Sequence, residues 1–336
     1  MLTKALAKQG KDPLMHRTDN QSLTGQGHDG AGVTRIMVLS AAIRLGIVVS
    51  ACLGMAACSG AKPQSQGVAQ QSVIAISGSD TMVNLSQMWA EEYGKKKPSV
   101  QVEVSGGGSG VGIRDLMQGV VQVANSSREL EPAERDQITR KAGKPPIETV
   151  VGHDGIAIYV HKDNPIESIT LKQLAQIFGE GGDVTSWSQL GVNINSGDKK
   201  DDIIRVSRQN SSGTYLYFRE HVLKKGDFKA GSCDMSGSKD VVELIARTKT
   251  AIGYSGMGYA TKEVKMLKIG TDENPAGIEP TQENVTKKVY PLSRALYMCT
   301  AGTPDGETKN YLDWILSADG QKIVVSAGYV PLHDGK

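Results

Sequence analysis

Three short polar loops of the sequence have the composition of anion-binding sites. They span residues 78–81, 106–112 and 208–214, and each lies between an expected strand and an expected helix. A helix N-terminus presents free backbone N–H groups and a positive dipole end, and glycines let a ligand approach the backbone closely. Arg208 adds a fixed charge whose planar geometry suits a tetrahedral oxyanion. One such loop is usually only a helix cap, but three in one chain favour an anion site.

The segments around these loops alternate between strand and helix patterns. Short apolar runs indicate strands at residues 72–77, 100–104, 120–124, 150–160, 203–206 and 251–254. Apolar residues at helical spacing predict helices at residues 82–93, 113–117, 131–141, 171–178, 215–223, 241–247 and 311–315. Thr170 is the expected cap of the helix that begins at residue 171. Repeated strand–loop–helix units predict an α/β protein whose mainly parallel sheets are flanked by helices.

Residues 36–58 have the features of a bacterial export signal. A short apolar run between Arg44 and Ala57 leads into Cys58, and this order is typical of a lipoprotein signal whose Cys is acylated. Cys52 is a competing match, and an ordinary cleaved signal with an incidental Cys is the alternative. We expect residues 1–57 to comprise a mis-started leader and the lipoprotein signal peptide: the start codon is placed too early, and Met37 is the true start. Residues 58–71 would form a flexible tether to a membrane.

Composition excludes several classes of function. Net charge is +2 for the whole chain, and 32 basic and 33 acidic side chains remain beyond residue 57, so nucleic acid is not an expected partner. The Gly-rich stretch at residues 106–112 lacks the spacing of a nucleophile elbow or a P-loop. Four His residues follow the leader without metal-ligand spacing, and His153 beside Asp154 is the one weak catalytic pair. We expect no cofactor, no metal and no catalysis.

Several motifs resemble the phosphate-binding component of Pst phosphate ABC transporters, in its lipoprotein branch. They occur in the family's order at residues 77–82, 105–112, 125–128, 154–157, 177–179, 187–188, 208–214, 251–256, 311–316 and 328–331. The resemblance covers roughly residues 72–332. It implies a two-lobed periplasmic-binding-protein fold of type II, with phosphate held at the hinge cleft. It also implies a monomeric receptor that delivers inorganic phosphate to ABC transporter permease subunits and touches the membrane only through its lipid.

The same resemblance implies where the lobes divide. Residues 72–152 and 255–336 would form lobe I, and residues 153–254 would form lobe II, with crossing strands near residues 151–160 and 251–254. The candidate ligand residues are Ser79, Thr81, Met82, Ser109, Ser127, Arg128, Asp154, Arg208, Ser212, Gly213 and Thr214.

One departure from the family pattern concerns selectivity. Many relatives have Asp where this chain has Ser127, and that carboxylate accepts the proton of phosphate, which sulfate does not carry. Asp154 is the expected substitute. A receptor for sulfate, molybdate or tungstate is therefore an alternative function, and a surface lipoprotein with a phosphatase-like or adhesive role is another. Cys233 and Cys299 could form a disulfide or remain two separate thiols.

Overall fold

The computed structural model describes residues 71–194, 201–271, 274 and 276–333. Nine of their strands form a mixed sheet with the neighbour order β2-β1-β3-β11-β4-β8-β6-β7 and with β9 paired to β4; β5 and β10 form a separate pair. The strands are β1 (Ser72–Gly78), β2 (Val100–Gly107), β3 (Val123–Ser126), β4 (Ile147–His161), β5 (Ser168–Thr170), β6 (Ile204–Arg208), β7 (Cys233–Met235), β8 (Ala251–Gly256), β9 (Val264–Met266), β10 (Lys268–Gly270) and β11 (Ser293–Thr300). The α-helices are α1 (Val83–Lys96), α2 (Ser109–Gln118), α3 (Pro132–Ala142), α4 (Leu171–Phe178), α5 (Gly213–His221), α6 (Ser238–Arg247), α7 (Gln282–Thr286), α8 (Gly306–Leu316) and α9 (Ala318–Ser326), and the short 3₁₀ helices are η1 (Ser188–Leu190) and η2 (Met257–Tyr259).

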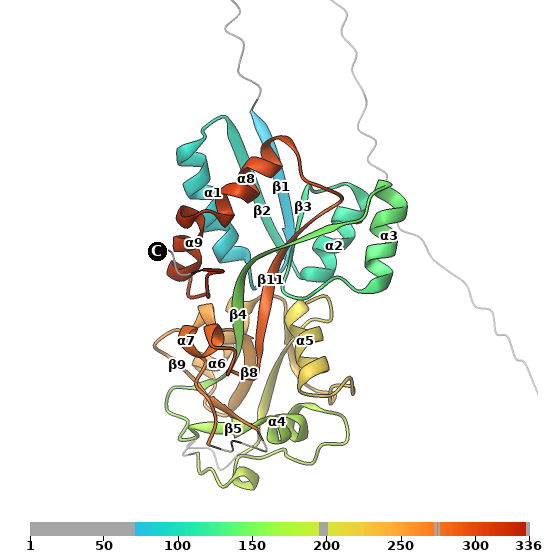
Figure 1. Cartoon of the computed structure of the whole chain (residues 1–336). Coiled ribbons are helices and arrows are strands. Elements are labelled where there is room, and N and C mark those ends of the chain that lie inside the picture. Colours follow the sequence, from blue (N-terminus) through green and yellow to red (C-terminus); the bar gives the residue numbers. More distant parts are fainter. Residues whose placement is uncertain (1–70, 195–200, 272–273, 275, 334–336) are drawn as a thin grey trace, which may run out of the picture. The chain divides into compact units, whose positions relative to one another are not determined.

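The first lobe is built on three parallel strands. β1 pairs in parallel with β2 on one side and with β3 on the other. In Figure 1, α1, α8 and α9 lie on one side of these strands and α2 and α3 on the other. Trp89, Met298 and Ile315 belong to its main apolar core. Because the strands are parallel, their carboxyl ends and the starts of α1 and α2 lie at one edge of the sheet.

The second lobe repeats this arrangement with a different set of strands. β6 pairs in parallel with β7 and β8, and β8 pairs in antiparallel orientation with β4. Its apolar core contains Phe178, Trp187, Phe218 and Tyr254, and the rings of Phe218 and Tyr254 stack with centroids 4.0 Å apart. The carboxyl end of β6 leads through the third polar loop into α5. This loop therefore occupies the same kind of position as the loops of the first lobe.

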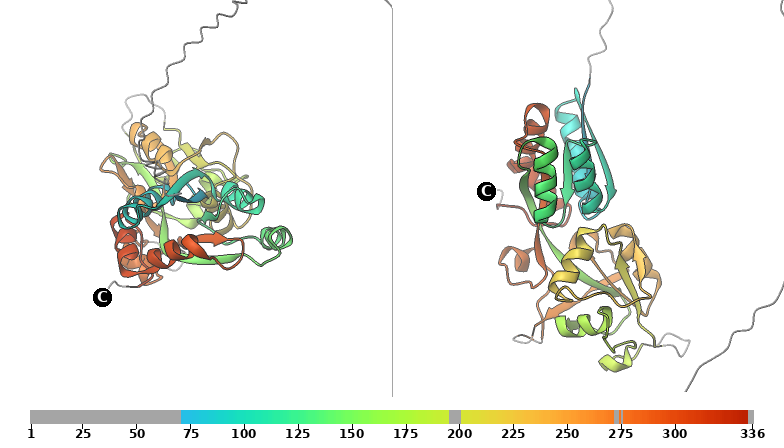
Figure 2. Two further views of the ribbon diagram at one scale, coloured as in Figure 1. Left: turned by 90° about the horizontal axis from the view of Figure 1, so that it is seen from above. Right: turned by 90° about the vertical axis from the view of Figure 1, so that its right-hand side faces the viewer.

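Two long strands connect the lobes. β4 pairs with β11 along its first half and with β8 along its second half. β11 lies between β3 and β4 and is antiparallel to both. Figures 1 and 2 show the lobes as two groups of helices and strands that these extended segments join along one side. This is the arrangement of a hinge, since few strands would need to bend for the lobes to move.

The return to the first lobe comes later than residue 255. Met257, Tyr290 and Leu292 pack in the core of the second lobe, whereas Leu296 and Met298 pack in that of the first. β8, which we expected to cross between lobes, is an interior strand of the second lobe, and the second crossing strand is β11. The reason is that residues 257–292 add η2, β9 and α7, which pack against β4, and β10, which pairs with β5, before the chain returns.

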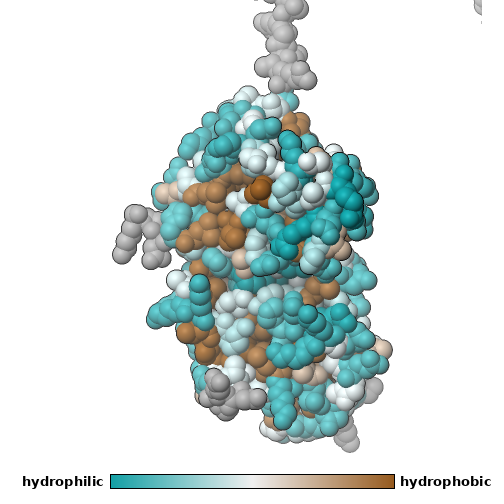
Figure 3. Space-filling view, turned by 45° about the vertical axis from the view of Figure 1, so that its right-hand side comes forward, coloured by the Kyte–Doolittle hydropathy of each residue, from teal (hydrophilic) through white to brown (hydrophobic). Residues whose placement is uncertain are grey.

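The remaining features of the described residues are a largely polar face (Figure 3) and two free cysteines. The face in Figure 3 is largely hydrophilic, with hydrophobic side chains in separate patches. Among the residues that the structure describes, no helix is both long and apolar enough to span a bilayer. Cys233 is exposed and Cys299 is buried, and both are free thiols. Cys58 and the tether lie outside the described residues, apart from Gln71.

Candidate anion-binding site

The first polar loop lies between β1 and α1 and is held in place by two tyrosines from later in the chain. The hydroxyl of Tyr259 donates to the carbonyl oxygen of Asp80 at 2.7 Å, and the hydroxyl of Tyr329 donates to that of Thr81 at 2.6 Å. Burial raises the pKa of both phenols, so both remain donors at neutral pH. Ser79 is 2% exposed, and its Oγ has no hydrogen-bond partner among the described residues.

The second polar loop brings the start of α2 against β1. Gly107 and Gly108 have φ angles of 112° and 96°, a region that side chains rarely adopt. A Cβ on Gly112 would collide with the carbonyl oxygen of Ser77, so the first turn of α2 touches the strand backbone. Ser109, the first residue of α2, accepts a hydrogen bond from the amide of Ser127 at 3.1 Å. The hydroxyl oxygens of these two serines lie 3.3 Å apart.

The third polar loop belongs to the second lobe and contacts the second loop directly. Ser212 caps α5, because its side chain accepts from the amide of Thr214 at 3.2 Å. The carbonyl oxygen of Ser211 accepts from the amide of Gly110 at 3.0 Å. A Cβ on Gly213 would collide with the hydroxyl of Ser109 and would lie 2.6 Å from that of Ser127. Only glycine therefore lets the start of α5 approach the first lobe this closely.

Donors from both lobes converge at the point where these loops meet. The hydroxyl oxygens of Thr81 and Thr214 lie 3.0 Å apart, although the residues are 133 positions apart in sequence. In the part of the chain that the structure describes, the amides of Thr81, Ser109 and Gly213 have no hydrogen-bond partner. The first residues of α2 and α5 and the loop just before α1 thus present unpaired N–H groups beside a group of hydroxyls, which is the arrangement that binds an anion.

Arg294, on β11, is the main site residue that sequence analysis did not identify. It is 5% exposed, and its Nη2 donates to the hydroxyls of Thr81 and Thr214 at 3.2 and 3.0 Å. Its Nε and Nη2 lie 3.1 and 2.8 Å from Oδ2 of Asp154, which is opposite in the β4–β11 register. Its Nη1 donates to the carbonyl oxygen of Ser127 at 3.2 Å. One guanidinium therefore contacts loops of both lobes and both hinge strands.

Asp154 is buried behind this guanidinium. Its Oδ2 accepts from Arg294 and its Oδ1 accepts from the amide of Met257 at 3.2 Å, so both oxygens are engaged. Burial raises the pKa of the Asp154 carboxyl, and Arg294 opposes that rise by stabilising the charged form. Asp154 thus reaches the group of hydroxyls through Arg294.

Arg208 also lies at the interface of the lobes. It pairs with Asp80 of the first loop, with Nη2 and Oδ2 3.0 Å apart. It also donates to the hydroxyl of Ser238 and the carbonyl oxygen of Ser236, each at 2.9 Å. Its buried Nε has no partner among the described residues, and burial lowers the pKa of the guanidinium while Asp80 opposes that change.

The side chains of two candidate residues, Met82 and Arg128, lie outside the group of hydroxyls and make structural contacts instead. The side chain of Met82 packs in the core of the first lobe, and its amide donates to the carbonyl oxygen of Ser79. Arg128 makes two hydrogen bonds of 2.7 Å with the carboxylate of Glu134. Both side chains are therefore committed to structural contacts.

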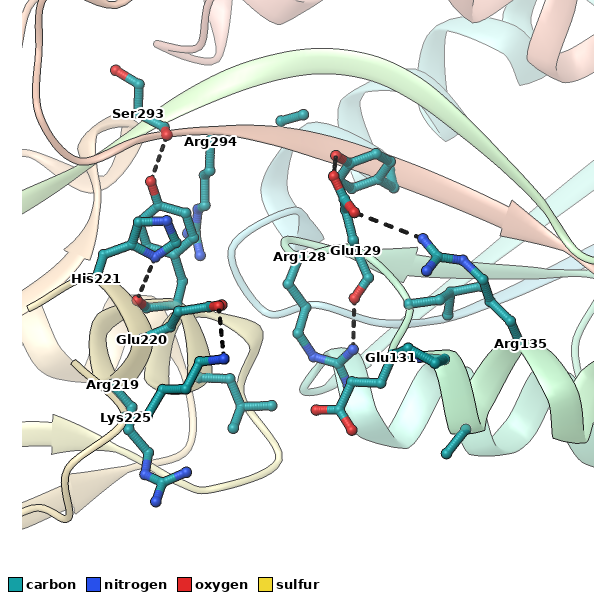
Figure 4. Close-up of a pocket in the computed structure, with 17 residues that line it drawn as sticks. Arg128, Glu129, Glu131, Arg135, Arg219, Glu220, His221, Lys225, Ser293 and Arg294 are labelled. Atoms are coloured by element: carbon teal, nitrogen blue, oxygen red, sulfur yellow. Dashed lines mark hydrogen bonds and ion pairs between the residues drawn. The ribbon is translucent and has the colours of Figure 1, made fainter. Parts of the chain in front are cut away.

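A cleft beside the group opens between the lobes (Figure 4). Its volume is about 1030 Å³, and Ser293, Arg294 and Ala295 of β11 line it together with residues from the two lobes. Arg128 and Glu131 line the side of the first lobe, and Tyr217, His221 and Lys225 line the side of the second lobe. The guanidinium of Arg294 lies 5.9 Å from the ring centre of Tyr217. Because Arg294 lines the cleft and also contacts Thr81 and Thr214, the cleft leads towards the convergent donors.

Other site types find less support in the same region. Within the described ranges, no group of three or more His, Cys, Asp or Glu side chains is placed to hold a metal ion. His153 lies opposite Ala295 and Asp154 opposite Arg294 in the strand register. Because successive side chains of a strand point to opposite faces, His153 and Asp154 cannot act as one catalytic pair. His153 instead lines a second cleft with Lys288 and Tyr290.

A two-lobed α/β fold with donors converging at the hinge is the architecture of a solute-binding protein. The family model described as a PBP superfamily domain matches residues 60–319, and the chain belongs to this superfamily. The curated relatives include the phosphate-binding protein PstS of Pseudomonas aeruginosa, 37% identical over 266 residues, which are 76% of this chain and 81% of the relative. PstS of Bacillus subtilis is 33% identical over 264 residues, or 78% of this chain and 82% of the relative.

Solved structures of similar proteins agree with this relationship. A phosphate-bound substrate-binding protein from Clostridium perfringens, assigned to a phosphate ABC transporter, has a TM-score of 0.68 and is 31% identical, covering 78% of this chain and 100% of that chain. An ABC-type phosphate transport receptor from Vibrio cholerae has a TM-score of 0.61 and is 28% identical, covering 76% of this chain and 99% of that chain.

Proposed function

We propose that this protein binds inorganic phosphate between its lobes and delivers it to an ABC importer. The observation that carries the proposal is the set of unpaired amides of Thr81, Ser109 and Gly213 at the interface, together with the buried, unpaired hydroxyl of Ser79 in the first polar loop. A buried polar group without a partner costs about 1–3 kcal/mol, so its retention points to a ligand that satisfies it. The names of the PstS relatives and the phosphate-bound neighbour support phosphate as that ligand.

The chemistry of the donors suits a tetrahedral oxyanion. Four oxygens pointing in different directions need donors from more than one element, and here the donors come from the loop before α1 and from the starts of α2 and α5. The hydroxyls of Thr81, Ser109, Ser127 and Thr214 complete the set, and Arg294 supplies positive charge. Because both lobes contribute donors, only the closed form would satisfy every oxygen, and binding would shift the protein towards closure. Permease subunits would then recognise the closed form.

Selectivity for phosphate would rest on hydrogen-bond acceptors near the anion. Both carboxylate oxygens of Asp154 are engaged, so this residue would act on the ligand by holding Arg294 rather than by accepting its proton. The hydroxyl oxygens of Ser109 and Ser127 would accept the proton of phosphate, but a hydroxyl can also turn and donate to sulfate, so they would discriminate less than a carboxylate does.

The role we propose is one of binding rather than of catalysis, because the buried carboxylate of Asp154 is paired with Arg294 and His153 lies on the other face of β4. We expect the protein to be exported as a monomer and anchored through lipid on Cys58, as the signal-like segment before that residue indicates. Metabolic labelling with a radioactive fatty acid tests the anchor: wild type should be labelled, and a Cys58→Ser variant should not.

Titration calorimetry tests the ligand. A form that begins at Ser59 would be unfolded and refolded to remove carried-over ligand, then titrated with phosphate and with sulfate. Phosphate should bind with a Kd of about 1 μM or lower, that is about −8 kcal/mol or stronger, and sulfate at least about tenfold more weakly. Equal binding of both anions would indicate a receptor for another oxyanion. A response to neither would reject the function.

A further inference from the structure

Asp80 and Arg208 form an ion pair that bridges the two lobes. Asp80 lies in the loop after β1 in the first lobe, and Arg208 ends β6 in the second, 128 positions later in the sequence. Their closest side-chain atoms are 3.0 Å apart, and the side chains are 14% and 0% exposed. Exposed pairs contribute little to stability, but a pair this buried interacts strongly because water does not screen it.

Each partner is also fixed by its own lobe. Oδ1 of Asp80 accepts from the amide of Gly107 at 2.9 Å, and Gly107 belongs to the second polar loop of the same lobe. Arg208 donates to Ser236 and Ser238, which lie at the start of α6 in its own lobe. Both side chains are therefore oriented independently of each other, and the lobes need only approach for Oδ2 to meet Nη2.

The pair lies at the same loops that carry the unpaired amides. Asp80 immediately precedes Thr81, and Arg208 begins the loop that ends at Thr214. With Nη1 and Nη2 engaged, the guanidinium of Arg208 has only Nε without a partner in the described chain. Its charge is thus already neutralised by Asp80, and an arriving anion meets a paired cation whose position Asp80 determines.

We infer that Asp80 is a positioning residue that orients Arg208 and fastens the two lobes in the closed form. Phosphate affinity then depends on Asp80 although its carboxylate does not bind the anion. This inference rests on the proposed function for its effect on phosphate, whereas the fastening of the lobes stands without any ligand. Removing Arg208 alone leaves the Asp80 carboxylate uncompensated beside the anion, so part of that loss would come from repulsion.

Hydrogen exchange of the ligand-free full chain tests the fastening. The amide of Gly110 donates to Ser211 across the lobes, so it reports on their separation. In Asp80→Asn, peptides spanning residues 107–116 should exchange at least about fivefold faster than in wild type, while a peptide from α4 should not change. Asp313→Asn, an exposed carboxylate of the first lobe, is the matched control and should behave like wild type. Unchanged exchange in Asp80→Asn would overturn the inference.

A double-mutant cycle tests the positioning. Asp80→Asn should weaken phosphate binding roughly 30-fold, mainly through faster dissociation, and Arg208→Met should weaken it further. The double variant should bind more tightly than Arg208→Met alone, because the repulsive carboxylate is gone. Effects that simply multiply would contradict the inference, as would tighter binding by Asp80→Asn. If wild type binds no phosphate but Asp80→Asn still speeds exchange, the proposed function fails and the fastening stands. If Asp80→Asn fails to fold, Asp80→Ser replaces it, since a hydroxyl still accepts from Gly107.

Discussion

The guanidinium of Arg294 lies 2.8 Å from the carboxylate of Asp154 and 3.0 Å from the hydroxyl of Thr214. Asp154 and Arg294 occupy opposite positions on β4 and β11, the two strands that join the lobes. The hinge is therefore in direct contact with the group of donors: Arg294 pairs with Asp154 across the two hinge strands and also donates to Thr214 at the start of α5 in the second lobe. A change in hinge geometry would alter the donors directly.

Arg294→Ala should destabilise the protein by about 3–5 kcal/mol, because it leaves the buried carboxylate of Asp154 without its counter-charge. The double variant Arg294→Ala/Asp154→Asn should recover a large part of that loss, since no uncompensated charge remains. Chemical denaturation of both variants measures the difference. Equal stabilities of the single and double variants would show that Asp154 is not charged in the folded protein.

Gly213→Ala should weaken phosphate binding at least about tenfold, because the added methyl group meets the hydroxyls of Ser109 and Ser127 and keeps α5 away from the first lobe. Gly94→Ala is the matched control: it lies in α1 with nothing within 4 Å of an added Cβ, and should stabilise the helix by up to about 1 kcal/mol. Calorimetric titration of both variants compares them. Normal affinity of Gly213→Ala would place the anion elsewhere.

The sequence was sufficient where local signals determine the structure. The helix expected at residues 171–178 has those bounds in α4, where Thr170 and Gln173 form the reciprocal cap. The three polar loops lie between strands and helices for the same reason: Gly and Ser residues follow apolar strand segments and precede apolar residues at helical spacing. The approach of Thr81 to Thr214 agrees with the family resemblance and was not visible in spacing alone.

The sequence was insufficient where pairing between distant segments determines the structure. β11 was not expected, because Ala295 and Tyr297 are as apolar as Leu296 and Met298, so the strand lacks a clear alternation. Only its position between β3 and β4 defines it. Arg294, Leu296 and Met298 are alternate residues of β11 and their side chains lie on its buried face. A charged residue in line with buried apolar ones is the one sequence signal that could have identified Arg294. Its partner Asp154 is 140 positions away, a distance over which no local pattern acts.

Alkylation should distinguish the two cysteines of the folded part. Cys233 is exposed on the edge strand β7, whereas burial raises the pKa of the Cys299 thiol far above neutrality. Iodoacetamide at pH 8 should therefore modify Cys233 within minutes and Cys299 only after denaturation. Mass spectrometry of the peptides measures both. Resistance of both residues in the absence of reductant, lost on reduction, would instead indicate a disulfide.

Stability should fall in mildly acidic solution because of His153. Burial and the nearby charge of Lys288 lower the pKa of this half-buried imidazole below its usual value near 6.5. The unfolded chain then binds more protons than the folded one between those two pKa values, so stability is lost as the pH falls below about 6.5. His153→Gln should flatten this part of the profile of unfolding free energy against pH. A slope that is the same in both proteins would assign the effect to other groups.

Ser79→Ala should separate ligand binding from stability. The hydroxyl of Ser79 is buried without a partner, so removing it should not destabilise the ligand-free protein, whereas phosphate binding should weaken by about 0.5–1.5 kcal/mol if the hydroxyl donates to the anion. Ser86→Ala is the contrasting variant, because the hydroxyl of Ser86 accepts from Asn125 at 2.8 Å in the buried interior of the first lobe. It should lower the unfolding free energy by about 1–3 kcal/mol. Thermal denaturation with and without phosphate measures both effects. If Ser79→Ala destabilised the ligand-free protein as Ser86→Ala does, Ser79 would have a structural partner, and the strongest sign of a ligand at this point would be lost.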